Sequence, residues 1–173
     1  QGVTTLTDGN DGTSPFPIRE HYQKIENTRI SPNWAVFVGQ GTIRQEVMGL
    51  ENRKPTASEL SKMKLMVKEA MEEGALGIST GLFYVPGSFS STSEVIELSK
   101  VASRYGGIYI SHMREEAVDV LKSINETINI GIKGNYFYTF FYLSFLFTYF
   151  YFSNYHYAKF TSDCHFIFVP FLY

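Results

Sequence analysis

Three short polar segments carry the residue types that could do chemistry. They span residues 9–15, 77–87 and 109–116. The first contains Asp11, the second contains Tyr84, and the third contains His112 and Arg114. Each segment follows or continues a stretch with the pattern of a β-strand. A histidine and a carboxylate at the ends of separate strands could share a metal ion, most plausibly zinc, so Asp11 and His112 are candidate metal ligands.

Each of these residues also has an ordinary structural interpretation. A single histidine after a strand is more often a hydrogen-bonded structural residue than a ligand. Asp11 lies in a glycine-rich loop and would suit a turn, and Tyr84 could simply anchor its loop. Arg114 could lie near the same strand ends as a substrate contact, or it could form an ion pair with Glu115 or Glu116.

Strand and helix patterns alternate through residues 1–134. Apolar and β-branched runs predict four strands, at Val3–Thr7, Trp34–Val38, Ala75–Ser79 and Ile108–Ser111. Capping-box sequences at Thr56–Glu59 and Ser91–Glu94, each followed by apolar residues at helical spacing, predict two of the intervening helices. Two more helices are predicted at Thr42–Leu50 and from about Glu115 to Ile130. The inward face of the last one is predicted to consist of Ala117, Val120, Leu121, Ile124 and Ile128.

This alternation predicts the α/β class, because repeated βα units form parallel sheets with right-handed crossovers. About four units make half of a (β/α)8 barrel of the TIM type, or most of a small doubly wound sheet. Polar residues follow the strands, at the edge where both architectures place their active sites. The first strand lacks a glycine-rich phosphate-binding sequence after it, which argues against nucleotide binding.

Composition narrows the classes of partner. A net charge of −2 over 173 residues does not supply the basic face that nucleic acid requires. The single cysteine, Cys164, cannot form an internal disulfide. The sequence starts at Gln1 and shows no signal-peptide pattern, so we expect a cytoplasmic protein and a piece cut from a longer chain.

Longer motifs give residues 1–134 a specific resemblance to the N-acyl-D-amino-acid deacylases (D-aminoacylases) of the amidohydrolase superfamily. The matching stretches are Gly2–Thr5, Gly9–Pro15, Val38–Gly49, Arg53–Thr56, Glu69–Leu82 and Tyr105–Arg114, in the family's order. The resemblance implies a (β/α)8 barrel in which zinc polarises a water molecule and the amide of a small N-acyl-D-amino acid. It also implies that His112 is a metal ligand and that Tyr84 contacts the substrate.

The sequence departs from the family at important positions. Asp11 stands where the deacylases commonly have a zinc-binding cysteine, and Gln40 stands where many have a histidine. The family's remaining metal-binding histidines, its lysine and its catalytic aspartate are not found here, so the catalytic residues are unknown and we expect this chain alone to be inactive. Another amidohydrolase, such as a cyclic amidase or a dipeptidase relative, remains an alternative, as does a non-enzymatic protein attached to a membrane.

The tail, residues 135–173, differs sharply from the rest. It holds 19 of the 28 aromatic residues and only two charged residues, Lys159 and Asp163. Its uncharged stretch, residues 135–158, is long enough to span a membrane, but phenylalanine and tyrosine fill its middle, which is untypical of such spans. We interpret the tail mainly as a translated intron or shifted frame without family resemblance, with a membrane anchor and a genuine packing segment as alternatives.

Overall fold

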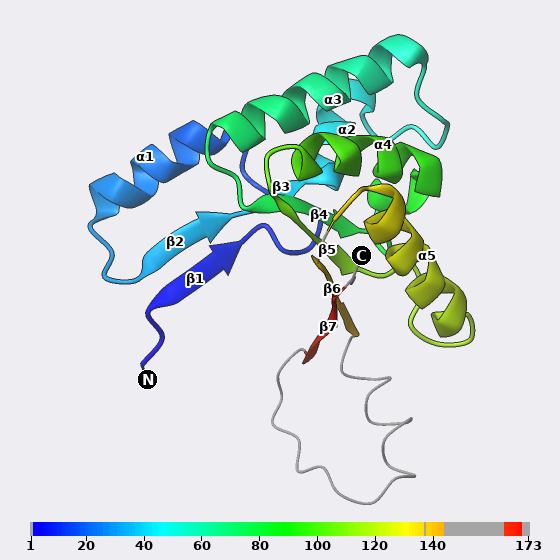
Figure 1. The fold of residues 1–173 in the computed structure, drawn as a ribbon. Coiled ribbons are helices and arrows are strands. Elements are labelled where there is room, and N and C mark those ends of the chain that lie inside the picture. Colours follow the sequence, from blue (N-terminus) through cyan, green and yellow to red (C-terminus); the bar gives the residue numbers. More distant parts are fainter. Residues whose placement is uncertain (1, 137, 144–164, 171–173) are drawn as a thin grey trace, which may run out of the picture.

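A computed structural model describes residues 2–136, 138–143 and 165–170 (Figure 1). The strands are β1 (Thr5–Asp8), β2 (Asn33–Val36), β3 (Val38–Gly39), β4 (Gly77–Gly81), β5 (Ile108–His112), β6 (Tyr138–Leu143) and β7 (His165–Pro170). The helices are α1 (Ile18–Thr28), α2 (Gln40–Met48), α3 (Ala57–Glu72), α4 (Thr92–Ser103) and α5 (Val120–Lys133), with a short 3-10 helix at Gly87–Phe89.

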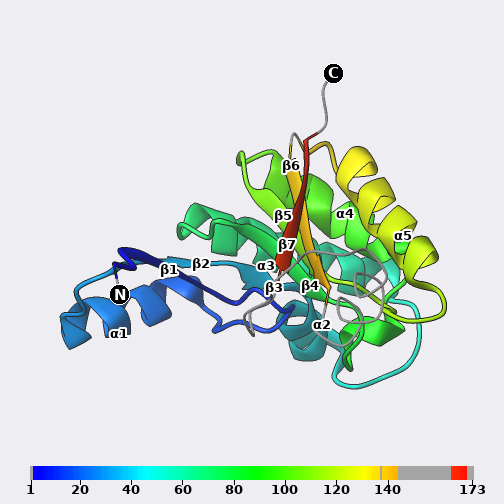
Figure 2. The ribbon, with the colours of Figure 1, turned by 90° about the horizontal axis from the view of Figure 1, so that it is seen from below.

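The strands form two connected sheets. β1 pairs in parallel with β2, and the second sheet has the order β3-β4-β5-β6-β7, parallel except for the antiparallel β6–β7 pair. Only Phe37 separates β2 from β3, so one continuous segment joins the two sheets. Figure 1 shows the helices along one side of the strands, and Figure 2 shows β1, β2 and α1 extending to one side of the larger sheet.

The core lies between the sheet and this helix layer. Four strand residues, Val36, Val38, Ile78 and Tyr109, are fully buried in it. They meet buried apolar residues of the helices, namely Ile18, Ile43, Met63, Val67, Leu98 and Ile130. The predicted alternation of parallel strands with helices is confirmed over residues 2–136, although β1 is mostly exposed and β2 is fully buried only at Val36.

The predicted helix starts at the capping boxes are also confirmed. Thr56 accepts the backbone N–H of Glu59 at 3.3 Å, and the Glu59 carboxylate accepts the backbone N–H of Thr56 at 2.7 Å. Ser91 accepts the backbone N–H of Glu94 at 3.3 Å and so caps α4. These bonds satisfy amide groups that a helix's first turn leaves without a partner.

The prediction for α5 is wrong in two respects. The helix begins at Val120 because residues 115–119 form a turn in which the Glu115 carboxylate accepts the backbone N–H groups of Ala117 and Asp119 at 3.0 and 2.6 Å. Leu121, predicted to face inward, is 68% exposed. The residues of α5 that are buried are Val120, Ser123, Thr127, Ile130 and Gly131. The Thr127 hydroxyl donates to the Ser123 carbonyl at 3.0 Å. The buried face of α5 therefore includes hydroxyl side chains, whereas only apolar residues were predicted there.

Two strands fall within the aromatic tail. β6 continues the parallel order beside β5, with His112 opposite Tyr142, and β7 returns antiparallel to it. The prediction of four strands therefore undercounts the described sheet, and α1 is a helix that the apolar pattern missed. Within the described residues no helix is long and apolar enough to cross a membrane. The possible membrane anchor in the tail falls largely on residues 144–164, which lie outside the described residues.

Candidate functional site

Three loops meet at the carboxyl ends of the strands because glycines let their backbones touch. Gly12 has a φ of +76°, and a Cβ there would contact the backbone of Gly81 and lie 2.9 Å from the carbonyl carbon of Thr80. A Cβ on Gly39 would lie 2.5 Å from the carbonyl oxygen of Gly12. The backbone N–H of Gly12 also donates to the Ser79 hydroxyl at 3.1 Å. The loop that carries Asp11 is thereby fixed against the ends of β3 and β4.

His112 is the last residue of β5 and the centre of this end of the sheet. It is 5% exposed, and its two ring nitrogens face different carboxylates. Nδ1 lies 3.0 Å from Oδ1 of Asp11, and Nε2 lies 3.2 Å from Oε1 of Glu116. The structure therefore brings together the two predicted metal ligands and adds Glu116, which the sequence analysis treated only as a possible partner of Arg114.

Two aromatic rings from the loop after β4 close over His112. The Tyr84 ring meets the imidazole edge to face, with centroids 4.8 Å apart and an interplanar angle of 74°. The Phe83 ring stacks on it at 5.7 Å and 27°. Tyr84 and Phe83 are 45% and 56% exposed, so each has one part on His112 and another part open to an incoming molecule. Tyr84 lies where a substrate contact is predicted, and Phe83 is a neighbour that the sequence analysis missed.

Arg114 lies near the same strand ends but makes different contacts from those predicted. Its Nε donates to the Glu126 carboxylate at 2.9 Å. Its Nη1 and Nη2 donate to the carbonyl oxygens of Ser88 and Ser90 at 2.8 and 2.9 Å. The side chain turns toward α5 and the loop before α4, and its ion pair with Glu126 is one that the sequence did not indicate.

A network of buried polar side chains joins α2 to α4 and to the loop before α4. Arg44 donates from Nη1 to both carboxylate oxygens of Glu94 at 2.6 and 2.8 Å, and both side chains are almost fully buried. Gln40 donates to the Ser90 hydroxyl at 2.7 Å and to Glu94 at 3.3 Å. Residue 40, noted in the sequence as a departure from the family, is therefore a link between α2 and the loop before α4. No local pattern indicates that Arg44 and Glu94 pair, since they lie 50 residues apart in two different helices.

The residues present match zinc in type but not in number. Imidazole and carboxylate groups are ligands of zinc, and catalytic zinc sites use three protein ligands with one open position. Among the residues that the structure describes, no group of three or more histidine, cysteine, aspartate or glutamate residues is arranged to hold a metal ion. Asp11 and Glu116 instead flank opposite nitrogens of one imidazole. The described residues therefore present one imidazole between two carboxylates, which is fewer suitably placed groups than a complete zinc site uses.

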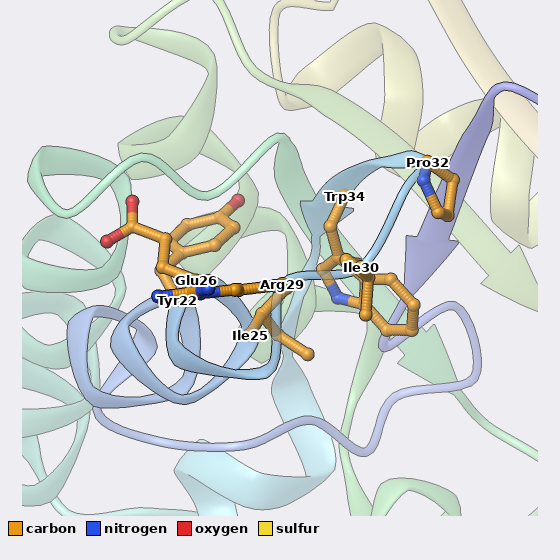
Figure 3. A pocket seen from close by; sticks show the side chains of 7 residues that line it. All are labelled: Tyr22, Ile25, Glu26, Arg29, Ile30, Pro32 and Trp34. Atoms are coloured by element: carbon orange, nitrogen blue, oxygen red, sulfur yellow. The ribbon is translucent and has the colours of Figure 1, made fainter.

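A separate pocket lies at the other end of β2. It has a volume of about 250 Å3 and is lined by Tyr22, Ile25, Glu26, Arg29, Ile30, Pro32 and Trp34. Figure 3 shows these side chains between the last turns of α1 and the first residues of β2. The pocket is at the amino end of the strand, whereas the site around His112 is at the carboxyl ends. It is therefore a distinct feature and not part of the predicted site.

Comparison with known proteins defines the class first. The chain matches no family model. It is similar to the crystal structure of a D-aminoacylase that defines a novel subset of amidohydrolases, with a TM-score of 0.72 and 31% identity over 79% of this chain and 34% of that one. It is also similar to N-acyl-D-glutamate deacylase from Bordetella bronchiseptica, solved with zinc and a phosphonate inhibitor, with a TM-score of 0.74 and 30% identity over 80% of this chain and 34% of that one. The fold is that of part of an amidohydrolase domain.

Sequence relatives identify the family within that class. D-aminoacylase of Alcaligenes xylosoxydans xylosoxydans is 34% identical over 76% of this chain and 32% of its own length. N-acyl-D-aspartate deacylase of the same organism is 31% identical over 76% of this chain and 31% of its own length. The larger part of this chain is a homologue of the N-acyl-D-amino-acid deacylases, as its motifs predicted, and it spans about a third of the length of these relatives.

Proposed function

We propose that this chain is part of a zinc-dependent amidohydrolase that cleaves the amide bond of N-acyl-D-amino acids. The observation that carries the proposal is the placement of His112 between the carboxylates of Asp11 and Glu116, at the carboxyl ends of parallel strands. The fold around this cluster is similar to that of a deacylase solved with zinc and a mimic of the reaction's tetrahedral intermediate. In this proposal His112 and Asp11 are metal ligands, and Tyr84 contacts the substrate.

The surroundings of His112 suit a ligand that must hold one orientation. A metal-binding histidine usually donates its second ring N–H to a carboxylate or carbonyl, which fixes the ring and its tautomer. Here each ring nitrogen has a carboxylate oxygen within 3.2 Å, so whichever nitrogen binds the metal, the other can keep such a partner. Phe83 and Tyr84 restrict rotation of the ring from the side.

The metal would supply what these side chains lack. Bound zinc acts as a Lewis acid on a carbonyl oxygen and makes a water molecule nucleophilic at neutral pH. The chain's own residues would then bind and orient: Tyr84 and Phe83 offer an aromatic wall to the acyl group, Asp11 and His112 hold the metal, and the Glu116 carboxylate orients the His112 ring. Asp11 is a harder ligand than the thiolate common in the family, so we expect weaker zinc binding than a cysteine would give.

Zinc binding by the purified chain tests the role of His112 directly. We expect His112→Ala to lower zinc affinity by more than the roughly 10- to 100-fold that loss of an outer-shell partner costs, because a direct ligand is lost; a competition titration against a chromogenic chelator measures this. His21→Ala is the matched control, since His21 also lies near a carboxylate, with its Nε2 3.4 Å from Oδ2 of Asp8, but outside the site. Equal affinity of the His112→Ala variant and the unaltered chain would refute the assignment.

A hydrolysis assay tests the reaction. N-acetyl derivatives of D-amino acids and of their L-enantiomers are incubated with the chain and zinc, and the released amine is measured. We expect no turnover by this chain alone, because its described residues supply too few ligands. D-selective turnover that disappears in His112→Ala would overturn the expected inactivity while supporting the proposed reaction, whereas L-selective turnover would contradict the proposed substrate class.

A further inference from the structure

The guanidinium group of Arg114 is engaged on three sides. Its Nη1 and Nη2 donate to the carbonyl oxygens of Ser88 and Ser90 at 2.8 and 2.9 Å. Its Nε and Nη2 donate to the two carboxylate oxygens of Glu126 at 2.9 and 3.0 Å, a bidentate pair. Such charge-assisted pairs fix geometry as well as contributing energy. With four of its hydrogen bonds made inside the protein, Arg114 is built to hold loops in place.

The two loops that Arg114 joins are the ones that carry the site. On one side, Arg114 lies between His112 and Glu116 in the chain, two residues from each. On the other side, Ser88 donates its backbone N–H to the Tyr84 carbonyl at 2.7 Å, so a displacement of Ser88 moves the backbone of Tyr84. One side chain therefore connects the backbone of Tyr84 with the segment that presents His112.

Glu126 anchors this connection to the helix layer. Besides the Arg114 guanidinium, its carboxylate accepts the hydroxyl of Thr92 at 2.7 Å. Thr92 is the first residue of α4 and Glu126 lies in α5. Arg114 therefore connects both loops to two helices that pack against each other, α4 and α5.

We propose that Arg114 is a positioning residue, which through Glu126 and the carbonyls of Ser88 and Ser90 sets the edge-to-face contact of Tyr84 with His112. This replaces the interpretation of Arg114 as a substrate contact. The importance of the contact for catalysis rests on the proposed function, but the positioning itself does not. Loss of the guanidinium releases the Tyr84 loop and separates the two rings, whether or not a metal or substrate is bound.

The test follows the Tyr84–His112 contact by NMR in the full 173-residue chain without metal. The histidine signal is assigned with His112→Ala, and the contact is measured as a nuclear Overhauser effect between the two rings. We expect the effect in the unaltered chain, its loss in Arg114→Gln, and weakening in Glu126→Gln. Arg114→Lys restores the charge without the fork geometry and is expected to recover the contact only in part.

Arg53→Gln is the matched control. Arg53 also makes a bidentate pair with a glutamate, Glu59, and also donates to a backbone carbonyl, that of Lys54, but it lies in the loop between α2 and α3. The ring contact is expected to persist in this variant. A second check is Tyr84→Ala: adding Arg114→Gln to it should cause no further change in the His112 signal, since the contact is already gone.

The outcomes separate the two proposals. An undisturbed ring contact in Arg114→Gln, measured at conditions where that variant remains folded, would overturn the positioning role. A persistent contact together with weakened binding of an N-acetyl-D-amino acid would instead support the substrate-contact interpretation. A lost contact in a chain whose zinc affinity does not depend on His112 would uphold the positioning role and refute the metal assignment.

Discussion

At the residue scale, glycines allow the site loops to approach closely, and His112 occupies the space between them. The glycines of the site loops allow the backbones to approach one another more closely than any Cβ would permit, and Gly12 adds a φ of +76°. His112 uses the resulting crowded space, in which two carboxylates and two aromatic rings surround one imidazole. The close approach of the loops is therefore a precondition for the cluster, and it can be tested apart from any chemistry.

Replacing Gly12 by alanine should destabilise the protein more than its backbone angle alone explains. A left-handed alanine costs about 1–2 kcal/mol, and forcing a methyl group into a packed site adds about 1–3 kcal/mol. Gly106→Ala is the matched control, since Gly106 has a φ of +71° but no atom within 4 Å of the position of its Cβ. Urea unfolding should show a larger loss for Gly12→Ala, and equal losses would show that the loop contact yields on substitution.

The sequence predicted that the candidate site residues lie together, but it did not predict all of their partners. Asp11, Tyr84 and His112 follow three different strands, and parallel strands bring their carboxyl ends together, so their proximity was predictable. The partner of Arg114 was not, because Glu126 lies 12 residues away on a helix. Its choice depends on how α5 packs, which no local spacing encodes. Glu116 was near in sequence, but only the turn at residues 115–119 directs it toward His112.

At the scale of elements, charged side chains join neighbouring helices of the layer. Arg44 of α2 pairs with Glu94 of α4 in the interior. Glu97 of α4 accepts from Lys100 of the same helix at 2.8 Å and from Lys64 of α3. The first pair is buried and the second group is about a third exposed, so the two should respond differently to solvent conditions.

The Glu97 cluster predicts a specific loss of stability in acid. Hydrogen bonds from Lys100 and Lys64 lower the pKa of Glu97 from 4.5 to about 2. Because the folded pKa is the lower one, this stabilisation is complete above pH 4.5 and disappears as the pH falls toward 2. Glu97→Gln should therefore reduce the free energy of unfolding by about 0.5–1 kcal/mol at neutral pH, a small value because solvent screens the pair.

Urea unfolding at a series of pH values checks this prediction. The difference between Glu97→Gln and the unaltered chain should shrink toward zero as the pH falls from 4.5 to 2. Glu69→Gln, the same change at an exposed glutamate of α3, serves as the control for replacing a carboxylate on a helix surface. A constant deficit for Glu97→Gln down to pH 2 would mean that the lost carboxylate acts through packing instead.

The helices differ in how well the sequence pattern predicts them. α3 and α4 were predictable because a capping box and an apolar stripe agreed. α1 was not, since Ile18 is its only buried residue and its Tyr22 is used for hydrogen bonds, donating to the Gly74 carbonyl and accepting the Val36 N–H. Its apolar residues Ile18, Tyr22 and Ile25 do have helical spacing, but they are few and stand in a strongly polar segment, so the pattern is easily overlooked.

At the scale of the whole molecule, hydroxyl groups are built into the interface between the sheet and the helices. Tyr109 of β5 shares a hydrogen bond of 2.9 Å with Thr80 of β4, which in turn donates to Ser111 at 2.9 Å. Tyr136 stacks against Tyr109 with ring centroids 6.0 Å apart and donates to the Ser99 carbonyl at 2.8 Å. The sheet and helix layer are thus joined by neutral tyrosines, which makes the assembled layers sensitive to alkali.

That sensitivity has a definite sign. Burial raises the pKa of Tyr109 from 10 to about 12 and also raises that of Tyr136. Since the folded pKa is the higher one, the stabilisation is complete below pH 10 and is lost as the pH rises through 12. Two pKa units correspond to about 3 kcal/mol for Tyr109, so the free energy of unfolding should fall steeply between these values.

Tyr109→Phe separates this effect from the titration of other groups. At pH 8 the variant should lose about 1 kcal/mol with the hydrogen bond to Thr80, but its stability should decline less steeply above pH 10, because phenylalanine has no proton to release. Urea unfolding across this range, with tyrosinate absorbance followed in parallel, measures both quantities. Parallel declines in the two proteins would mean that burial does not raise the pKa of Tyr109 and that other groups cause the loss of stability in alkali.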